Sequence, residues 1–123
     1  MLSNTMIERL NQQINMEHYS ANLYLQMSAW CDHQGLSGSA AFLKQHAAEE
    51  MEHMHRLFCY VSETGALPLV GALKAPPVQY KNLAEVFKAT YEHELEVTRS
   101  INALVAAAQL NRSEERRVGK ECR

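Results

Sequence analysis

A stretch of ten residues with three histidines and three glutamates is the part of this sequence best suited to metal chemistry. The stretch HAAEEMEHMH covers residues 46–55 and contains no glycine or proline. Glu50 and His53 are three residues apart, so their side chains point to the same side of a helix. A carboxylate oxygen and an imidazole nitrogen together suit iron, manganese or zinc better than calcium or magnesium. The pair therefore indicates part of a metal site.

Three segments carry apolar residues at helical spacing, and we expect helices at residues 5–32, 39–64 and 83–111. Their expected N-caps are small polar residues, namely Thr5, Ser39 and Asn82. The short turn after residue 32 makes the first two helices antiparallel neighbours. Each helix also has one glutamate near the middle of its apolar face. These glutamates are Glu17, Glu50 and Glu94.

The connection between the second and third predicted helices, residues 66–81, is far longer than a helix hairpin needs. At about 3.3 Å per residue it can reach roughly 50 Å, whereas the second helix spans roughly 40 Å. The connection can therefore run back along the bundle and set the third helix parallel to the second. Glu50 and Glu94 then lie at the same depth, and Glu17 lies near the level of His53. The alternative is a disordered linker.

Three converging glutamates need a counter-charge. A buried, ionised carboxylate without a partner costs several kcal/mol, and neighbouring carboxylates raise one another's pKa. No lysine or arginine lies on the three apolar faces near that depth. A multivalent cation bound by the three glutamates would supply the missing positive charge. For any single glutamate, the alternative is a position at the edge of the apolar face, with the carboxylate in water.

Composition excludes several classes of protein. With 46% hydrophobic residues the body of the chain should fold, and a net charge of −2 does not favour nucleic-acid binding. The N-terminus lacks a signal-peptide core, and no segment approaches the roughly 20 apolar residues of a membrane span. The three cysteines are widely spaced and odd in number. We expect reduced thiols and a cytoplasmic protein.

Residues 112–123, RSEERRVGKECR, differ in composition from the rest of the chain. They hold five of the 12 basic residues and three of the 14 acidic ones, without apolar periodicity. We interpret this tail as non-native, a sequencing-adapter artefact read in one frame, so that residues 1–111 form the domain. A basic arm for nucleic acid is the alternative.

Over residues 1–111 the sequence resembles the bacterial non-haem ferritins. The matching stretches are MIERLNQQINMEHYSANLYLQMSAWC, AAFLKQHAAEEMEHMHRLF, ETGALP and LAEVFKATYEHELEVT. The resemblance implies an all-α, ferritin-like four-helix bundle. Only the first two helices and most of the third, with a long crossover connection, fall within this chain. The family's fourth helix supplies further ligands, so we expect incomplete second and third iron sites. We also expect the chain as written to aggregate or to stay partly unfolded.

The resemblance also implies a ferroxidase centre, with iron ligands Glu17, Glu49, Glu50, His53 and Glu94. Glu17, Glu50 and His53 would hold the first iron, while Glu50 would bridge to a second iron that Glu94 also holds. Glu49 would belong to a possible third iron site, and Tyr24 would lie beside the centre as a hydrogen-bond partner and electron donor. The implied function is oxidation of Fe(II) by dioxygen or hydrogen peroxide, with storage of ferric mineral in a cage of 24 subunits.

Two other functions remain open from the sequence. One is a di-metal oxidoreductase of rubrerythrin type, although no CxxC motif occurs in the chain. The other is a helical interaction module without metal, in which the glutamates set packing register. No haem is expected, although Met51 follows the central glutamate. The remaining polar residues of this region are expected at the surface: His18, His46, Glu52, His55, Glu92 and His93.

Overall fold

The computed structural model describes residues 2–122, and it describes side-chain surroundings for residues 2–112. Three helices make up the fold, α1 (Asn4–His33), α2 (Ser37–Glu63) and α3 (Leu83–Cys122). No strand occurs among the described residues, which confirms the predicted all-α class. Within residues 2–122, no helix has the length and apolar character needed to cross a bilayer.

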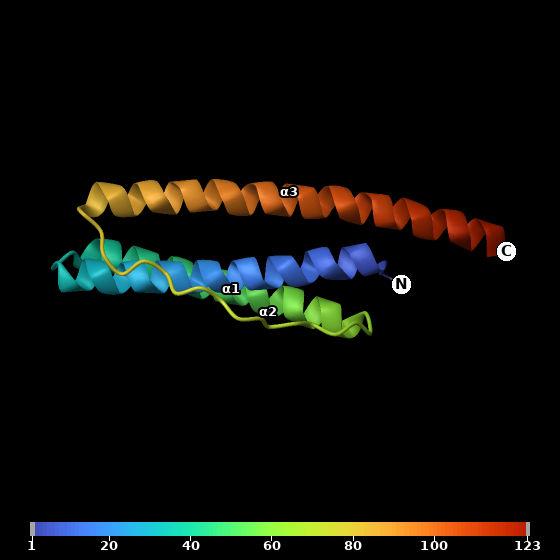
Figure 1. Cartoon of the computed structure of the whole chain (residues 1–123), viewed down its shortest axis with the longest axis horizontal. Helices are drawn as coiled ribbons and strands as arrows, with labels where there is room; N and C mark the ends of the chain where they lie inside the picture. Colours follow the sequence, from blue (N-terminus) through green and yellow to red (C-terminus); the bar gives the residue numbers. More distant parts are fainter. Residues whose placement is uncertain (1, 123) are drawn as a thin grey trace.

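Helices α1 and α2 form an antiparallel hairpin with a tight turn (Figure 1). Gly35 adopts a φ of 77°, a left-handed conformation that favours glycine. The amide of Leu36 then donates to the carbonyl of Cys31 at 2.8 Å, which closes the end of α1. The hairpin aligns the middle of α2 with the middle of α1, where Glu50 and Glu17 lie.

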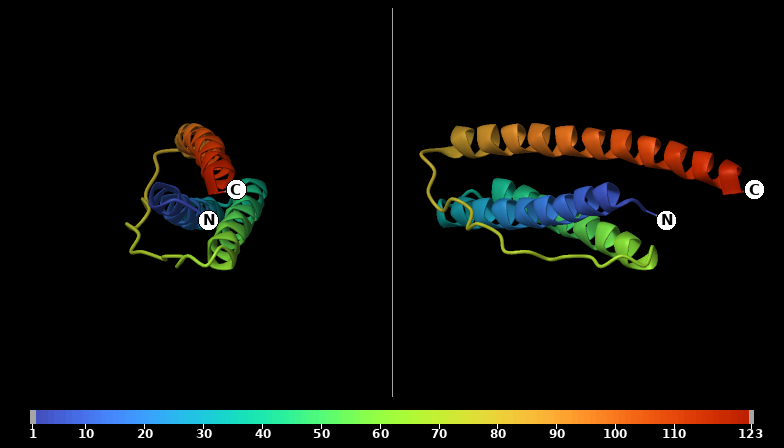
Figure 2. Two further views of the ribbon diagram at one scale, coloured as in Figure 1. Left: turned by 90° about the vertical axis from the view of Figure 1, so that its right-hand side faces the viewer. Right: turned by 45° about the vertical axis from the view of Figure 1, so that its right-hand side comes forward.

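The long connection between α2 and α3 is ordered and runs back along α1 (Figures 1 and 2). Two asparagines of α1 hold it. Asn11 Oδ1 accepts from the amide of Leu69 at 2.8 Å, and Asn15 Oδ1 accepts from the amide of Gly71 at 2.7 Å. These bonds satisfy backbone groups that an irregular segment would otherwise leave to water. Helix α3 is therefore parallel to α2, as predicted, and the disordered linker is excluded.

Two helix starts differ from the prediction. Helix α1 begins at Asn4, because Ser3 Oγ, not Thr5, accepts from the amide of Met6 at 3.1 Å. Helix α2 begins at Ser37 after Leu36, which makes no side-chain cap, so Ser39 lies inside the helix. The third start was predicted correctly, since the side-chain oxygen of Asn82 accepts from the amide of Glu85 at 2.9 Å.

Helix α3 continues to Cys122, although its end was predicted near residue 111. Residues 112–122 contain no proline and are rich in arginine, glutamate and lysine, which are good helix formers. Helical structure alone does not distinguish native from added sequence. The interpretation of residues 112–123 as non-native therefore stays a prediction.

Apolar residues of α1 form a core at each end of the bundle. One cluster, around Tyr24, Met27 and Leu43, lies toward the α1–α2 turn. The other, around Ile14 and Met54, lies toward the N-terminus of α1. Helices α2 and α3 each pack against α1, but their backbones do not pack against each other in the described part of the chain. The polar residues of interest lie between the two clusters.

One face of α3 is left open. Phe87 and Ile101 are 38% and 39% exposed, and Tyr91 and Val105 are more exposed still. Their spacing places all four on one side of the helix, together with Glu94. Phe42 of α2 borders the same opening and lies against Phe87, with ring centroids 6.2 Å apart. These five apolar residues are called the open face below. They are exposed because no helix among the described residues covers them.

Candidate metal centre

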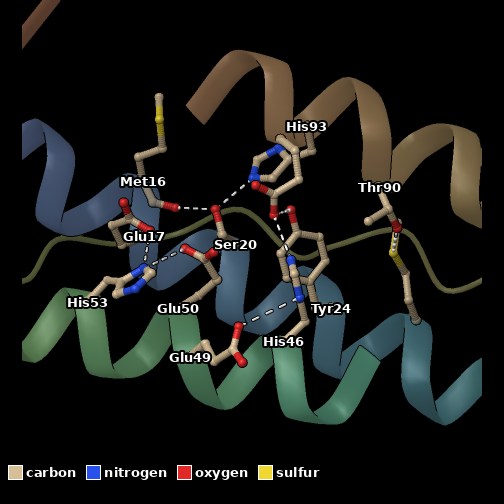
Figure 3. Close-up of polar contacts among 12 residues, drawn as sticks. Met16, Glu17, Ser20, Tyr24, His46, Glu49, Glu50, His53, Thr90 and His93 are labelled. Carbon is tan, nitrogen blue, oxygen red and sulfur yellow. Dashed lines mark hydrogen bonds and ion pairs between the residues drawn. The ribbon is translucent and has the colours of Figure 1, made fainter. Parts of the chain in front are cut away.

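Carboxylate and imidazole groups from all three helices converge in the middle of the bundle (Figure 3). The first group consists of Glu17 from α1 with Glu50 and His53 from α2. The second consists of His46 and Glu50 from α2 with Glu94 from α3. Within each group, one donor atom per residue lies within 4.8 Å of the others. Glu50 belongs to both groups, so the two potential metal positions share a carboxylate.

The first group leaves acceptor atoms buried without a hydrogen bond. Glu17 and Glu50 are only 2% and 5% exposed, and the Oε2 atom of each is buried without a hydrogen-bond partner. Gln13 donates to the other oxygen of Glu17 at 3.0 Å. The Nδ1 atom of His53 lies 3.9 Å from Glu17 Oε2 and 3.7 Å from Glu50 Oε2. Buried oxygens that face an imidazole nitrogen at these distances fit a cation between them.

The second group centres on one oxygen of Glu94. The hydroxyl of Tyr24 donates to Glu94 Oε1 at 2.6 Å, and the Nε2 atom of His46 lies 3.1 Å from the same oxygen. On the other side of the imidazole, Nδ1 of His46 lies 3.8 Å from Glu49 Oε2. The side chain of Glu49 is 52% exposed and lies outside the two groups. Burial and the adjoining Glu94 carboxylate raise the pKa of Tyr24, so its hydroxyl stays a donor.

The protonation of Glu50 follows from its surroundings. Burial, and then the adjoining carboxyl of Glu17, raises the pKa of Glu50 to about 9. The metal-free protein therefore keeps Glu50 protonated at neutral pH. A cation must displace this proton, since a carboxylate binds metal in its ionised form.

We expect the metal-free protein to lose stability as the pH rises toward about 9. A glutamate in an unfolded chain titrates near pH 4.3, so between these values the folded state binds one more proton at Glu50 than the unfolded state. The contribution of Glu50 is thus fully present below about pH 4.3 and is lost as the pH rises through the folded-state pKa. Denaturant unfolding with a chelator, near pH 5 and near about pH 8.5, measures the effect.

The matched variants for this prediction are Glu50→Gln and Glu52→Gln. Glu50→Gln removes the titrating group and should flatten the pH dependence, so this variant should be more stable than the wild type near pH 8.5. Glu52 is exposed on the same helix and pairs with Arg56 at 2.6 Å. Its substitution should leave the slope unchanged. Equal slopes in the wild type and Glu50→Gln would contradict the assignment of the shifted pKa.

Two histidines predicted at the surface lie in or beside the centre. His46 is four residues before Glu50, and that spacing alone could have placed both on one helix face. His93 is packed between α1 and α3, with its side chain 11% exposed. Its Nε2 atom lies 2.7 Å from Ser20 Oγ, and its ring lies edge-on to that of Tyr24 at 5.8 Å. Burial lowers the pKa of His93, so this imidazole is a neutral neighbour of the centre.

The other polar residues divide between surface and interior. Three lie at the surface as expected: Glu52, His55 and Glu92. His18, which was also expected there, is half-buried, and its Nδ1 atom is buried without a hydrogen-bond partner. His53 was expected to point inward. It lies near both buried carboxylates, but its side chain is 50% exposed.

Some helical bundles bind metal through glutamates and histidines on facing helices. The two groups described above, which share Glu50, give this structure the arrangement of that class. The sequence matches the ferritin-like domain over residues 7–114. The chain therefore belongs to the ferritin-like family, as its resemblance to bacterial ferritins predicted.

Individual relatives agree with this assignment. The chain is 57% identical over 105 residues to a "Probable bacterial non-heme ferritin-like protein" of Haemophilus influenzae, covering 85% of this chain and 64% of the relative. It is 50% identical over 111 residues to the "Bacterial non-heme ferritin" of Escherichia coli, covering 90% of this chain and 67% of that protein. The chain thus spans about two thirds of the length of these relatives.

Solved ferritin structures share the fold. Chlorobium tepidum ferritin superposes with a TM-score of 0.88 at 47% identity, covering 94% of this chain and 71% of that one. An open-pore ferritin from Archaeoglobus fulgidus superposes with a TM-score of 0.86 at 37% identity, covering 92% of this chain and 69% of that one. The parallel placement of α3 therefore belongs to a known ferritin arrangement.

Proposed function

We propose that this chain is the greater part of an iron-storage ferritin that oxidises Fe(II) at the centre described above. This proposal rests on the two groups of three potential ligands that share the buried Glu50. Relatives that are half or more identical to the matched region are named non-heme ferritins or ferritin-like proteins. A helical interaction module without metal gives no reason for carboxylates and imidazoles from three helices to form two groups that share one glutamate.

In this proposal iron is the substrate, and the two donor groups are its binding positions. Glu17, Glu50 and His53 bind the first Fe(II), and Glu50 together with Glu94 binds the second. The shared carboxylate holds the two ions close together and offsets part of their mutual repulsion. Tyr24 holds Glu94 in place through its 2.6 Å hydrogen bond and is positioned to donate an electron.

The reaction balances with two iron ions per dioxygen. Each Fe(II) gives up one electron, and dioxygen takes up both electrons and two protons to become hydrogen peroxide. Hydrogen peroxide could serve as oxidant in turn, taking two electrons and two protons to give two waters. The protein fixes ligand geometry and charge, while the change of oxidation state occurs at the metal ions.

Storage requires more than the centre. We assign Glu49, at the exposed edge of the second group, to a possible third iron site. We further propose that full-length chains assemble into a cage of 24 copies that holds ferric mineral. We place the protein in the cytoplasm, where Cys31 and Cys59, both free thiols, would stay reduced. The side chain of Cys122 lies outside the described residues.

An Fe(II) titration tests this function. We expect near-ultraviolet absorbance of ferric products to appear on adding Fe(II) in air, with a break near two iron ions per chain. The reaction should be faster than Fe(II) autoxidation in protein-free buffer. A nonionic detergent that covers the open face should be present. A rate equal to that of buffer alone, with no bound iron after gel filtration, would favour the interaction module.

A further inference from the structure

The second donor group contains a nitrogen ligand that the proposed function does not use. Glu50 and Glu94 offer only oxygen atoms to the second metal. We propose that His46 binds this second metal through Nε2, so that His46, Glu50 and Glu94 form a three-residue site built from α2 and α3. This inference rests on the proposed function, because it concerns a second ion at the same centre.

The distances fit direct coordination. Ligand nitrogens and oxygens lie about 2.0–2.2 Å from a transition metal, so two ligands of one ion are about 3 Å apart. His46 Nε2 and Glu94 Oε1 are 3.1 Å apart. Glu50, which is 5% exposed, has a carboxylate oxygen within 4.8 Å of the donor atoms of His46 and Glu94. An ion among the three residues would thus be held by one imidazole nitrogen and two carboxylates.

The imidazole of His46 is held in an orientation that suits a ligand. Its ring stacks on Phe42 at 5.6 Å and meets the Tyr24 ring edge-on at 5.2 Å. With Nε2 on the metal, Nδ1 carries the proton and faces Glu49 Oε2 at 3.8 Å. A metal-bound histidine usually directs its second nitrogen to such a carboxylate, which fixes the tautomer.

The position of the site adds a structural consequence. Helices α2 and α3 each pack on α1 but not on one another through their backbones. In the metal-free protein, His46–Glu94 and Phe42–Phe87 are side-chain contacts between them. A metal bound by His46, Glu50 and Glu94 links α2 to α3 directly. Metal binding should therefore stabilise the packing of α3, and His46 should be needed for that effect.

Metal titration of the 123-residue chain tests the proposal without relying on oxidation. Co(II) is added anaerobically in nonionic detergent, and bound metal is counted from the visible absorbance. We expect two Co(II) ions per chain in the wild type. In His46→Gln, which keeps an amide near Glu94, the second ion should bind at least about tenfold more weakly, since even groups that only orient a ligand contribute about 10–100-fold. His55→Gln, an exposed histidine on the same helix, should keep both ions.

A direct readout uses Zn(II) and the chain labelled with ¹⁵N in its histidines. Two imidazoles, those of His46 and His53, should show the nitrogen shifts of metal coordination, and Nε2 should be the bound atom of His46. Circular dichroism checks that each variant keeps its helices. If His46→Gln fails to fold, the wild-type nitrogen shifts alone show whether His46 binds the metal.

Failure of this inference and failure of the proposed function give different results. Two bound ions with the His46 nitrogens unshifted, or undiminished second-ion binding in a folded His46→Gln, would overturn the role of His46 and leave the proposed function intact. Failure of the wild type to bind any Co(II) or Zn(II) would overturn both. Loss of the first ion in His53→Ala, with His46 still coordinated, would support both assignments.

Discussion

Replacing Glu50 with alanine should abolish rapid Fe(II) oxidation, because this residue contributes to both donor groups. Substitutions of groups that merely orient a metal ligand already cost about 10–100-fold in affinity or activity. Loss of the shared carboxylate should exceed that range. The measurement is the initial rate of ferric absorbance after a fixed addition of Fe(II). It is made on this chain and on a full-length relative with the equivalent substitution.

The matched control for Glu50→Ala is Glu52→Ala. Both glutamates lie on α2, but Glu52 is exposed and pairs with Arg56 rather than with the centre. Its replacement should leave the rate unchanged. Unaltered oxidation kinetics in Glu50→Ala would remove the centre from the mechanism. An equal loss in both variants would indicate a general effect of removing a carboxyl group from α2.

The open face should make this chain self-associate. Phe42, Phe87, Tyr91, Ile101 and Val105 are each at least 38% exposed, and together they line the side of α2 and α3 that no described helix covers. Burial of apolar surface stabilises association by roughly 25 cal/mol per Å², and patches of this kind mark interaction sites or aggregation hazards. Light scattering should give a mass well above the 14.0 kDa monomer, increasing with concentration.

Paired substitutions localise this effect. Ile101→Gln with Val105→Gln makes the open face more polar and should shift the mass toward the monomer. Leu25→Gln is the control, since Leu25 is 50% exposed but lies on α1. A wild-type chain that is monodisperse at 14.0 kDa and melts cooperatively would refute the prediction. An equal response to Leu25→Gln would mean that apolar exposure in general, rather than this face, drives association.

The elements of this fold were predictable because local sequence determines them. Apolar residues three and four apart identified all three helices, and Asn82 was correctly taken as a cap. The course of the long connection was also predicted correctly. Its length left two possibilities, a return along the bundle that makes α3 parallel to α2, or a disordered linker. The starts of α1 and α2 were wrong by one or two residues, since Ser3 and Leu36 occupy the cap positions. Several polar residues near a helix start compete as caps, and the turn before the helix decides among them.

The candidate centre was predictable in part. The sequence placed one glutamate on each apolar face and predicted that they would meet, and the structure places Glu17 and Glu94 each in a group of potential ligands that includes Glu50. Their role as ligands stays a prediction. His46 and His93 were assigned to the surface because each lies beside the predicted apolar stripe rather than on it. Their burial depends on where α3 lies against α1, which periodicity within one helix does not encode.

The sequence by itself determined the helices, their order, and the glutamate that each sends inward, because these follow from side-chain spacing along one chain. Only the tertiary structure decided that His46 joins Glu50 and Glu94 in one group of potential ligands. The α1–α2 hairpin sets the separation of Glu17 and Glu50, while the connection, bound by Asn11 and Asn15 of α1, leads to α3 and so affects the level of Glu94. The same packing places His46 within 3.1 Å of Glu94 and leaves the open face uncovered. Contacts between helices depend on the positions of two or more elements at once, so the spacing of residues within one helix does not predict them.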